Sequence, residues 1–230
     1  MKLGGDEQSR PPRLAVLGSR EWWMGSHVRL CSEVGRGLAR RFQCLELVTN
    51  GMEAVQAVVA TAFLREAVVL GRAGRGALSV RYITPSNVPG AQAPILPEGV
   101  AEDAVVRTVA GATHAEARMA LAEAADACLL ISGGPGSASV AERALSAGRP
   151  VLCVPLTGGA AAGGFWLPAD LRSAPAWLQR HPAGPALWAA LSGAEATARK
   201  GDAAASAAVE ALVLVPSLAG SPVLSASAKL

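Results

Sequence analysis

The sequence predicts an α/β fold in which helices cover both faces of a mainly parallel sheet. Short apolar runs alternate along the chain with longer segments whose apolar residues recur at helical spacing. The runs are apolar at nearly every position, as in parallel strands that are buried on both faces. Hydrophobic residues make up 51% of the 230 residues and charged residues 17%, which excludes a disordered chain and suits one well-buried domain. We therefore expect a Rossmann-like three-layer α/β/α domain with additional C-terminal helices.

Apolar periodicity and turn residues indicate the order of the elements. The short apolar runs predict strands over residues 14–17, 45–49, 77–83, 105–109, 127–131 and 150–155. Apolar residues three and four positions apart predict helices over residues 28–42, 52–70, 114–125, 139–147, 186–200 and 203–214. Turns that contain glycine end three of the strands, and these turns are Gly18-Ser19, Asn50-Gly51 and Gly133–Ser137.

The two ends of the chain differ in composition from its middle. Residues 1–12 are polar and contain Pro11-Pro12, which predicts a disordered leader, and the small, polar residues 216–230 predict a disordered tail. Between them we expect a single domain over residues 13–215, with a Trp- and Pro-rich part from about residue 158. The leader lacks the apolar segment of a signal peptide, and charges, prolines or glycines interrupt the longer apolar stretches. We therefore expect a cytoplasmic protein that binds no membrane.

The cysteines and the charged residues bear on possible partners. The four cysteines have no paired short spacing, which predicts buried free thiols in a reducing compartment: Cys31, Cys44, Cys128 and Cys153. We expect neither a metal nor a cofactor. The net charge is +3, and the densest basic group has one aromatic neighbour; it consists of Arg65, Arg72, Arg75 and Arg81. We interpret this group as a solvated surface and expect no nucleic-acid partner.

A glycine-rich run, Gly133-Gly134-Pro135-Gly136-Ser137, lies between a buried strand and an Ala-rich helix. Glycines allow a backbone to approach a ligand closely, and the N–H groups that begin a helix attract anions. Because the carboxyl ends of parallel strands share one edge of the sheet, we expect the other two glycine turns at the same edge. The predicted phosphate-binding residues are Gly133, Gly134, Gly136 and Ser137, and the residues predicted to line the rest of the ligand are Gly18, Ser19, Asn50 and Gly51.

Two well-known phosphate-binding motifs do not account for this run. The P-loop pattern G-x-x-x-x-G-K-[ST] does not occur in the chain. The spacing Gly134-x-Gly136-x-x-Ser139 approaches the dinucleotide fingerprint, but the next strand lacks the acidic residue that would bind a ribose hydroxyl. The sequence therefore favours a phosphate site of another kind.

Four segments together resemble a known superfamily. They are Gly18-Ser19, Leu47–Met52, Ala125–Ser137 and Ala147–Pro155. They resemble the SLOG superfamily, which includes the lysine decarboxylase-like Lonely Guy phosphoribohydrolases and related nucleotide-sensing domains, over roughly Leu14 to Phe165. The resemblance implies a nucleotide-binding protein whose partner is a phosphorylated nucleoside or a related small molecule, with a homodimer left open. It implies either a nucleoside 5′-monophosphate phosphoribohydrolase that cleaves the N-glycosidic bond or, as the alternative, a non-catalytic nucleotide sensor.

The motif departs from the P-G-G-x-G-T-x-x-E pattern of these enzymes. Ser132 stands in place of the proline, Ser137 in place of the threonine and Val140 in place of the glutamate. Glu142 follows two residues later, a turn of about 200° around a helix, so it replaces the carboxylate only if the helix begins later or is locally shifted. In the enzyme hypothesis Glu142 is catalytic and stabilises an oxocarbenium ion or activates water. The alternative is a capping box formed by Ser139 and Glu142.

The helix before the motif carries a second catalytic candidate, Arg118. The enzymes place an Arg-Lys pair on this helix, and ungapped counting puts Ala117 and Arg118 at those positions. The resemblance implies that Arg118 neutralises the phosphate, whereas a surface arginine would pair with Glu116, Glu123 or solvent. His114 begins the same helix and is as consistent with a cap or loop residue as with an acid/base group.

Aromatic residues near the glycine turns have two interpretations. Phe165 and Trp166 follow the loop that begins at Thr157, and they either stack on a base or pack against the C-terminal helices or a second copy. Trp22 and Trp23, beside the first turn, have the same two interpretations. A structural module that interacts through its Trp-rich C-terminal part is the remaining hypothesis.

Overall fold

A parallel sheet of six strands forms the centre of the protein. The computed structural model describes residues 10–19, 26–51, 54–87, 96–193 and 200–218. The strands are β1 (Arg13–Gly18), β2 (Leu45–Thr49), β3 (Leu78–Thr84), β4 (Val105–Val109), β5 (Ala127–Ile131) and β6 (Val151–Val154). They lie in the order β4-β3-β2-β1-β5-β6, and every neighbouring pair is parallel. The predicted α/β class and parallel sheet are confirmed.

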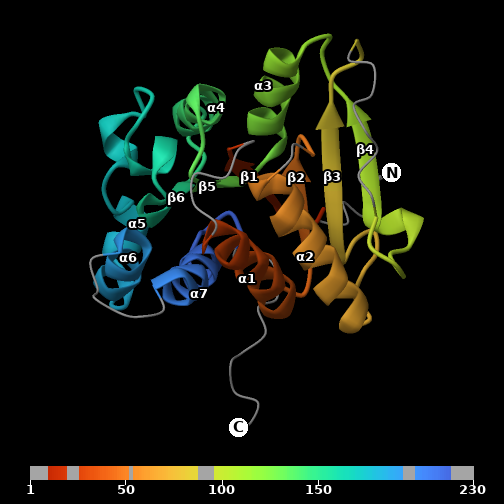
Figure 1. Cartoon of the computed structure of the whole chain (residues 1–230), viewed down its shortest axis with the longest axis horizontal. Helices are drawn as coiled ribbons and strands as arrows, with labels where there is room; N and C mark the ends of the chain where they lie inside the picture. Colours follow the sequence, from red (N-terminus) through yellow and green to blue (C-terminus); the bar gives the residue numbers. More distant parts are fainter. Residues whose placement is uncertain (1–9, 20–25, 52–53, 88–95, 194–199, 219–230) are drawn as a thin grey trace, which may run out of the picture.

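Helices cover both faces of this sheet. The α-helices are α1 (Ser26–Arg41), α2 (Val55–Val69), α3 (His114–Ala124), α4 (Pro135–Ser146), α5 (Ala176–Gln179), α6 (Gly184–Ser192) and α7 (Lys200–Val213). The short 3-10 helices are η1 (Glu102–Ala104), η2 (Pro155–Thr157), η3 (Gly159–Ala162) and η4 (Ala169–Leu171). Figure 1 shows α1 and α7 on one side of the sheet and α3 and α4 on the other. Among the described helices, none is long and apolar enough to cross a membrane.

The path of the chain across the sheet explains the two layers. From β1 the chain moves outward through β2 and β3 to β4 at the edge, and it then returns to the centre, where β5 pairs with β1. Right-handed crossovers that proceed in opposite directions place their helices on opposite faces. The helices α1 and α2 therefore cover one face, and α3 and α4 cover the other.

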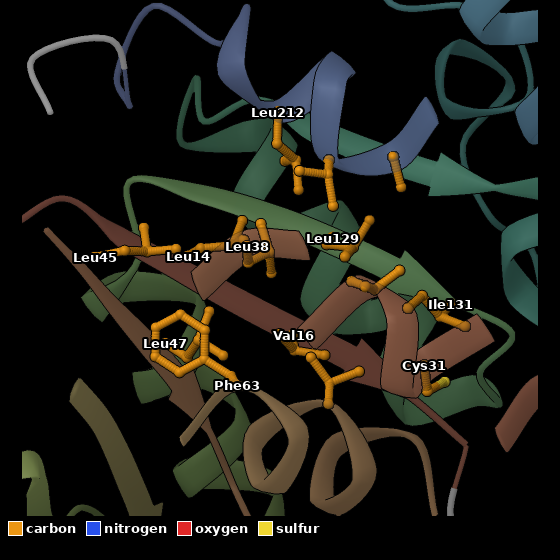
Figure 2. Packing of buried hydrophobic residues seen from close by; sticks show 14 of the residues in the cluster. Leu14, Val16, Cys31, Leu38, Leu45, Leu47, Phe63, Leu129, Ile131 and Leu212 are labelled. Atoms are coloured by element: carbon orange, nitrogen blue, oxygen red, sulfur yellow. The ribbon is translucent and has the colours of Figure 1, made fainter. Parts of the chain in front are cut away.

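Alternate strand residues form two hydrophobic cores. Leu14 and Val16 of β1 belong to the core under α1, α2 and α7, whereas Ala15 and Leu17 belong to the core under α3 and α4. Figure 2 shows the first core, in which Leu38 of α1 and Leu212 of α7 lie near the strand residues. Full burial of a leucine side chain contributes about 1.5–3 kcal/mol, so these cores fix the helices on the sheet.

Some helix boundaries differ from the prediction. Helix α4 begins at Pro135 rather than at residue 139, because proline is well tolerated at the first helical position although it suggests a loop in the sequence. The helix expected over residues 186–200 is α6, which ends before Gly193, where φ is +71°. Helix α5 lies in the Trp- and Pro-rich part and was not predicted.

The ordered domain extends beyond both of its expected ends. Arg10, expected in the disordered leader, forms two hydrogen bonds of 2.8 and 2.7 Å with the Asp126 carboxylate. Ser217, expected in the tail, donates to the Asp126 carbonyl at 2.9 Å, and Leu218 is fully buried. Both extensions contact the connection between α3 and β5. Residues 1–9 and 219–230 lie outside the described part of the chain.

The basic group expected on the solvated surface has structural roles at two of its positions. The Arg72 guanidinium donates to the carbonyls of Ala39 and Phe42 at 2.6 and 3.0 Å, at the C-terminal end of α1. Arg81 of β3 binds the buried Glu46 carboxylate at 2.9 Å. The solvated interpretation is therefore wrong for Arg72 and Arg81, because both guanidinium groups satisfy acceptors of the fold.

None of the four cysteines forms a disulfide, as predicted, and the predicted burial holds for three of them. Cys31, Cys128 and Cys153 are buried and Cys44 is half-buried. Burial raises the pKa of the Cys31, Cys128 and Cys153 thiols to about 12. These three thiols therefore stay protonated and unreactive at neutral pH.

Candidate functional site

The strands that follow β1 in the sequence extend the sheet in one direction as far as β4, and β5 and β6 extend it in the other direction. The two halves of the sheet meet where β1 pairs with β5. At the carboxyl ends of these strands Gly18 is the register partner of Ile131, so the turns that follow them are neighbours. One turn leads to α1 on one face and the other leads to α4 on the opposite face (Figure 1). Such a switch point opens a crevice in which α/β proteins bind ligands. Two of the three predicted glycine turns therefore lie side by side at this crevice.

The turn after β5 has an unusual backbone conformation that a second loop stabilises. The φ angles are +58° at Ser132 and +97° at Gly133, in the region that favours glycine. The Ser132 carbonyl accepts from the Ala161 N–H at 2.9 Å, and the Gly133 carbonyl accepts from the Ala160 N–H at 2.8 Å. The Ser132 N–H donates to Thr157 Oγ1 at 2.6 Å. The segment after β6 thus holds the turn in place by three hydrogen bonds.

Helix α4 begins on this turn without a side-chain cap. Gly134 is the N-cap and Pro135 follows it in the first turn of the helix. The N–H groups of Gly134 and Gly136 have no hydrogen-bond partner within the described ranges. A Cβ at Gly134 would meet no atom within 4 Å, so this position faces open space. The positive end of the α4 dipole therefore presents unpaired donors at an open surface.

The Arg118 guanidinium of α3 lies against this end of α4. A Cβ on Gly136 would stand 3.2 Å from Arg118 Cζ and Nε and 3.3 Å from Nη1, so the missing side chain makes room for the guanidinium. Arg118 is half-buried and forms no hydrogen bond or ion pair with another described residue. The expected pairing is absent because Glu123 binds Arg143 at 3.0 Å and Glu116 caps α3. A cation at the positive end of a helix is unfavourable by itself.

Ser137 and Gly18 connect the two turns of the crevice to each other. Ser137 Oγ donates to the Gly18 carbonyl at 3.0 Å and so ties α4 to the end of β1. A Cβ on Gly18 would lie 2.3 Å from Val55 Cγ1 and 3.0 Å from the Ile131 carbonyl oxygen. Gly18 is therefore required by the packing of α2 against the sheet. Ser19, which follows it, is half-buried.

Asn50 and Gly51 are also used by the fold. Asn50 Nδ2 donates to the Ile83 carbonyl at 2.8 Å and to the Ala117 carbonyl at 3.3 Å, joining the end of β2 to β3 and α3. Gly51 has a φ of +68°, and its N–H donates to Thr49 Oγ1 at 3.1 Å. Both residues shape the carboxyl edge of the sheet, where the sequence predicted them.

Glu142 does not occupy the position that either hypothesis requires. Because α4 begins at Pro135, Glu142 lies in the second half of the helix and is exposed. The predicted capping box with Ser139 is wrong, since Gly134 is the N-cap and Ser139 Oγ donates instead to the Pro135 carbonyl at 3.1 Å. The helix begins earlier than expected, so the later start that would realign Glu142 does not occur.

A capping box is present at the start of α3, where the sequence did not predict one. Thr113 Oγ1 accepts from the Glu116 N–H at 3.3 Å, and the Glu116 carboxylate accepts from the Thr113 N–H at 2.9 Å. The hydrogen bonds from the Ala112 and Thr113 N–H groups lower the pKa of Glu116. His114 follows the cap as the first helical residue and is exposed. This cap fixes the first turn of the helix that carries Arg118.

Two buried polar residues were not among the predicted site residues. Ser132 is 1% exposed, and its Oγ has no hydrogen-bond partner in the described structure. His27, in the first turn of α1, is 5% exposed with an unpartnered Nδ1, and burial lowers its pKa. The sequence contained a signal that could have identified Ser132, because this residue stands in place of the proline of the related motif. No sequence signal identified His27, because it lies on the apolar face of α1 with Leu30 and Cys31.

The aromatic candidates differ in what the structure describes. Phe165 packs partly buried against the core under α3 and α4, whereas Trp166 is 88% exposed. Trp22 and Trp23 lie outside the described residues.

Two surface grooves lie on the other side of the sheet. A groove of about 560 Å³ runs between α1 and α7, and one of about 430 Å³ runs between α1 and α2. The first is lined by charges that already pair, since Arg29 binds Asp202 at 2.7 Å and Arg41 binds Glu210 at 3.3 Å. Such paired charges gain little from a charged ligand. The unpaired arginine and the free helix end are instead at the crevice of β1 and β5.

Comparisons with known proteins bear on the fold. No protein-family model matches the sequence, and no curated protein matches it. Among solved structures, the protein TM1055 is 23% identical with a TM-score of 0.50, over 65% of this chain and 78% of that chain. The molybdenum cofactor carrier protein of Chlamydomonas reinhardtii is 20% identical with a TM-score of 0.45, over 62% of this chain and 75% of that chain.

A third solved structure corrects the expectation about nucleic acids. It is the DNA processing protein A of Helicobacter pylori, described for its single-stranded DNA binding mode; it is 13% identical with a TM-score of 0.41, over 64% of this chain and 68% of that chain. The exclusion of nucleic acid as a partner is therefore wrong, because a protein of similar fold binds single-stranded DNA. This chain has a Rossmann-like α/β fold similar to that of TM1055, as expected from the sequence.

Proposed function

We propose that this protein is a binding module for a phosphorylated, nucleotide-like small molecule, whose phosphate lies at the start of α4. One observation carries the proposal: the half-buried Arg118 guanidinium lies against Gly136 with no described partner. Electrostatics disfavours this arrangement unless an anion lies between the guanidinium and the helix. A phosphate would turn the unfavourable contact into a favourable one.

The surrounding groups suit a phosphate in size and chemistry. The free N–H groups of Gly134 and Gly136 supply donors from the helix, and Arg118 supplies charged donors from α3. The absence of a side chain at Gly134 leaves room for phosphate oxygens near the backbone. The Ser132 hydroxyl, buried in the same turn without a partner, adds unused hydrogen-bonding capacity. The resemblance to the SLOG superfamily supports a nucleotide as the carrier of this phosphate.

The proposal is binding rather than N-glycosidic cleavage. Cleavage with an oxocarbenium-like transition state calls for a carboxylate beside the sugar. The first turn of α4 contains no acidic residue, and Glu142 lies exposed in its second half. These positions favour the non-catalytic alternative over the phosphoribohydrolase.

Calorimetric titration of AMP, ribose 5-phosphate and adenosine into the full-length protein tests the proposal. We expect AMP and ribose 5-phosphate to bind and adenosine to bind at least tenfold more weakly, because it lacks the phosphate. Arg118→Gln should weaken AMP binding by about tenfold to hundredfold, since a hydrogen bond to a charged group contributes about 1.5–3 kcal/mol.

Arg143→Gln is the matched control for the loss of one positive charge. Arg143 is exposed on α4 and pairs with Glu123, away from Gly136. This variant should bind AMP like the wild type. Equal affinity for AMP and adenosine, or equal loss in the Arg118 and Arg143 variants, would contradict the proposed site.

A further inference from the structure

Trp166 combines high exposure with a strained backbone. Trp166 is 88% exposed, more than any other large hydrophobic residue in the described part of the chain. The φ angles are +56° at Phe165 and +59° at Trp166, and two consecutive bulky residues in this region are a true conformational outlier. Such strain persists only where the surrounding structure enforces it, and it is frequent at ligand sites.

Residues on both sides hold Trp166 in this conformation. Phe165 packs against the core under α3 and α4, and Leu167 is fully buried. The Leu167 N–H donates to the Gly164 carbonyl at 3.2 Å, and Arg172 Nε and Nη2 donate to the Leu167 carbonyl at 3.1 and 2.9 Å. The neighbours of Trp166 are thus anchored while its own ring is left to solvent.

The segment that carries Trp166 is bonded to the turn beside the anion site. The Gly164 N–H donates to the Gly159 carbonyl at 3.0 Å, and Ala160, next to Gly159, donates to the Gly133 carbonyl at 2.8 Å. Trp166 follows Gly164 by two residues, which span at most about 7 Å of chain. The backbone at Trp166 is therefore held close to Gly133 and the start of α4.

We propose that Trp166 stacks on the nucleobase of the ligand whose phosphate lies at Gly136 and Arg118. This inference rests on the proposed function and extends it to the ligand's second half. An indole face stacks on any nucleobase, and its exposure in the free protein leaves that face available. The ligand class is thus a phosphate joined to a planar base, from a free nucleotide or from single-stranded nucleic acid.

Titrations of AMP and ribose 5-phosphate into Trp166→Ala and Trp166→Phe test this inference. Loss of the ring should weaken AMP binding about tenfold and leave ribose 5-phosphate binding unchanged, because only AMP carries a base. Trp166→Phe retains an aromatic ring and should restore most of the affinity. Val69→Ala removes apolar surface from another highly exposed residue, on α2 across the sheet, and should leave both ligands unaffected.

A stability measurement separates stacking from misfolding. Trp166→Gly relieves the positive φ and should raise the melting temperature by roughly 2–4 °C while weakening AMP binding as Trp166→Ala does. If AMP binding depends on Arg118 but is equal in wild type and Trp166→Ala, the stacking inference fails and the proposed function stands. If the wild type binds neither AMP nor ribose 5-phosphate, both fail.

An oligothymidylate titration distinguishes the two sources of the base. Affinity that exceeds that of AMP, falls with salt and depends on Trp166 indicates single-stranded nucleic acid. AMP binding in the absence of oligonucleotide binding indicates a free nucleotide. Oligonucleotide binding that is unchanged in Trp166→Ala would contradict stacking in that complex.

Discussion

Gly136→Ala separates the stability of the protein from its proposed binding of phosphate. Gly136 lies in the first turn of α4 at ordinary helical φ, so alanine fits the backbone and reduces the entropy of the unfolded chain. The new Cβ would lie 3.2–3.3 Å from three guanidinium atoms of Arg118, the flexible end of a long side chain. A shift of a few tenths of an ångström relieves this contact at little cost.

We expect Gly136→Ala to stabilise the folded protein and to weaken phosphate binding. Replacing a helical glycine by alanine raises the free energy of unfolding by about 0.5–1 kcal/mol, or roughly 1–4 °C in melting temperature for a domain of this size. The same methyl group fills the space in which the guanidinium and the phosphate would meet. Losing one charge-assisted hydrogen bond there costs about 1.5–3 kcal/mol, a tenfold to hundredfold weaker affinity.

Calorimetric melting without ligand and titration with ribose 5-phosphate measure the two effects on Gly136→Ala. A suitable control is Gly148→Ala, because Gly148 has open space around it and lies beyond the end of α4, where φ is +71°. The control should lose stability through backbone strain and retain its affinity. Wild-type affinity in a stably folded Gly136→Ala protein would refute the placement of the phosphate.

Three further predictions follow from single contacts. Gly18→Ala should lower the free energy of unfolding by about 1–3 kcal/mol, measured by urea denaturation, because its Cβ would overlap Val55; an unchanged midpoint would show that α2 can move away freely. Glu142→Gln should change neither the melting temperature nor AMP affinity, since Glu142 is exposed away from the helix start; release of ribose 5-phosphate by the wild type that disappears in this variant would restore the enzyme hypothesis. Burial lowers the pKa of His27, so as the pH falls the unfolded chain binds a proton at this residue before the folded protein does. The free energy of unfolding therefore decreases as the pH falls through the unfolded pKa of about 6.5. His27→Gln should therefore lose less melting temperature than the wild type between pH 7.5 and 5.5, and parallel curves would contradict this assignment.

The sequence predicted the elements that depend on local patterns. The strands over residues 45–49, 105–109 and 127–131 have the predicted bounds, because runs of five residues rich in β-branched and apolar residues favour a strand over a helix. The start of α4 was misplaced because Gly134-Pro135-Gly136 has the composition of a loop. The composition of that same run, with glycines on both sides of Pro135, led to the prediction of an anion site at this turn.

The contacts that bring the candidate site residues together depend on the tertiary structure alone. Apolar periodicity reports that a residue is buried, but it does not report which element buries it. The return of the chain from β4 to β5 places the Gly18 turn beside the Ile131 turn and brings α3 against α4. Only that packing shows that Arg118 lies on Gly136 and pairs with neither Glu116 nor Glu123. It also separates the predicted residues that face open space, such as Gly134, from those that hold the fold, such as Gly18, because the partners of a side chain come from distant parts of the chain.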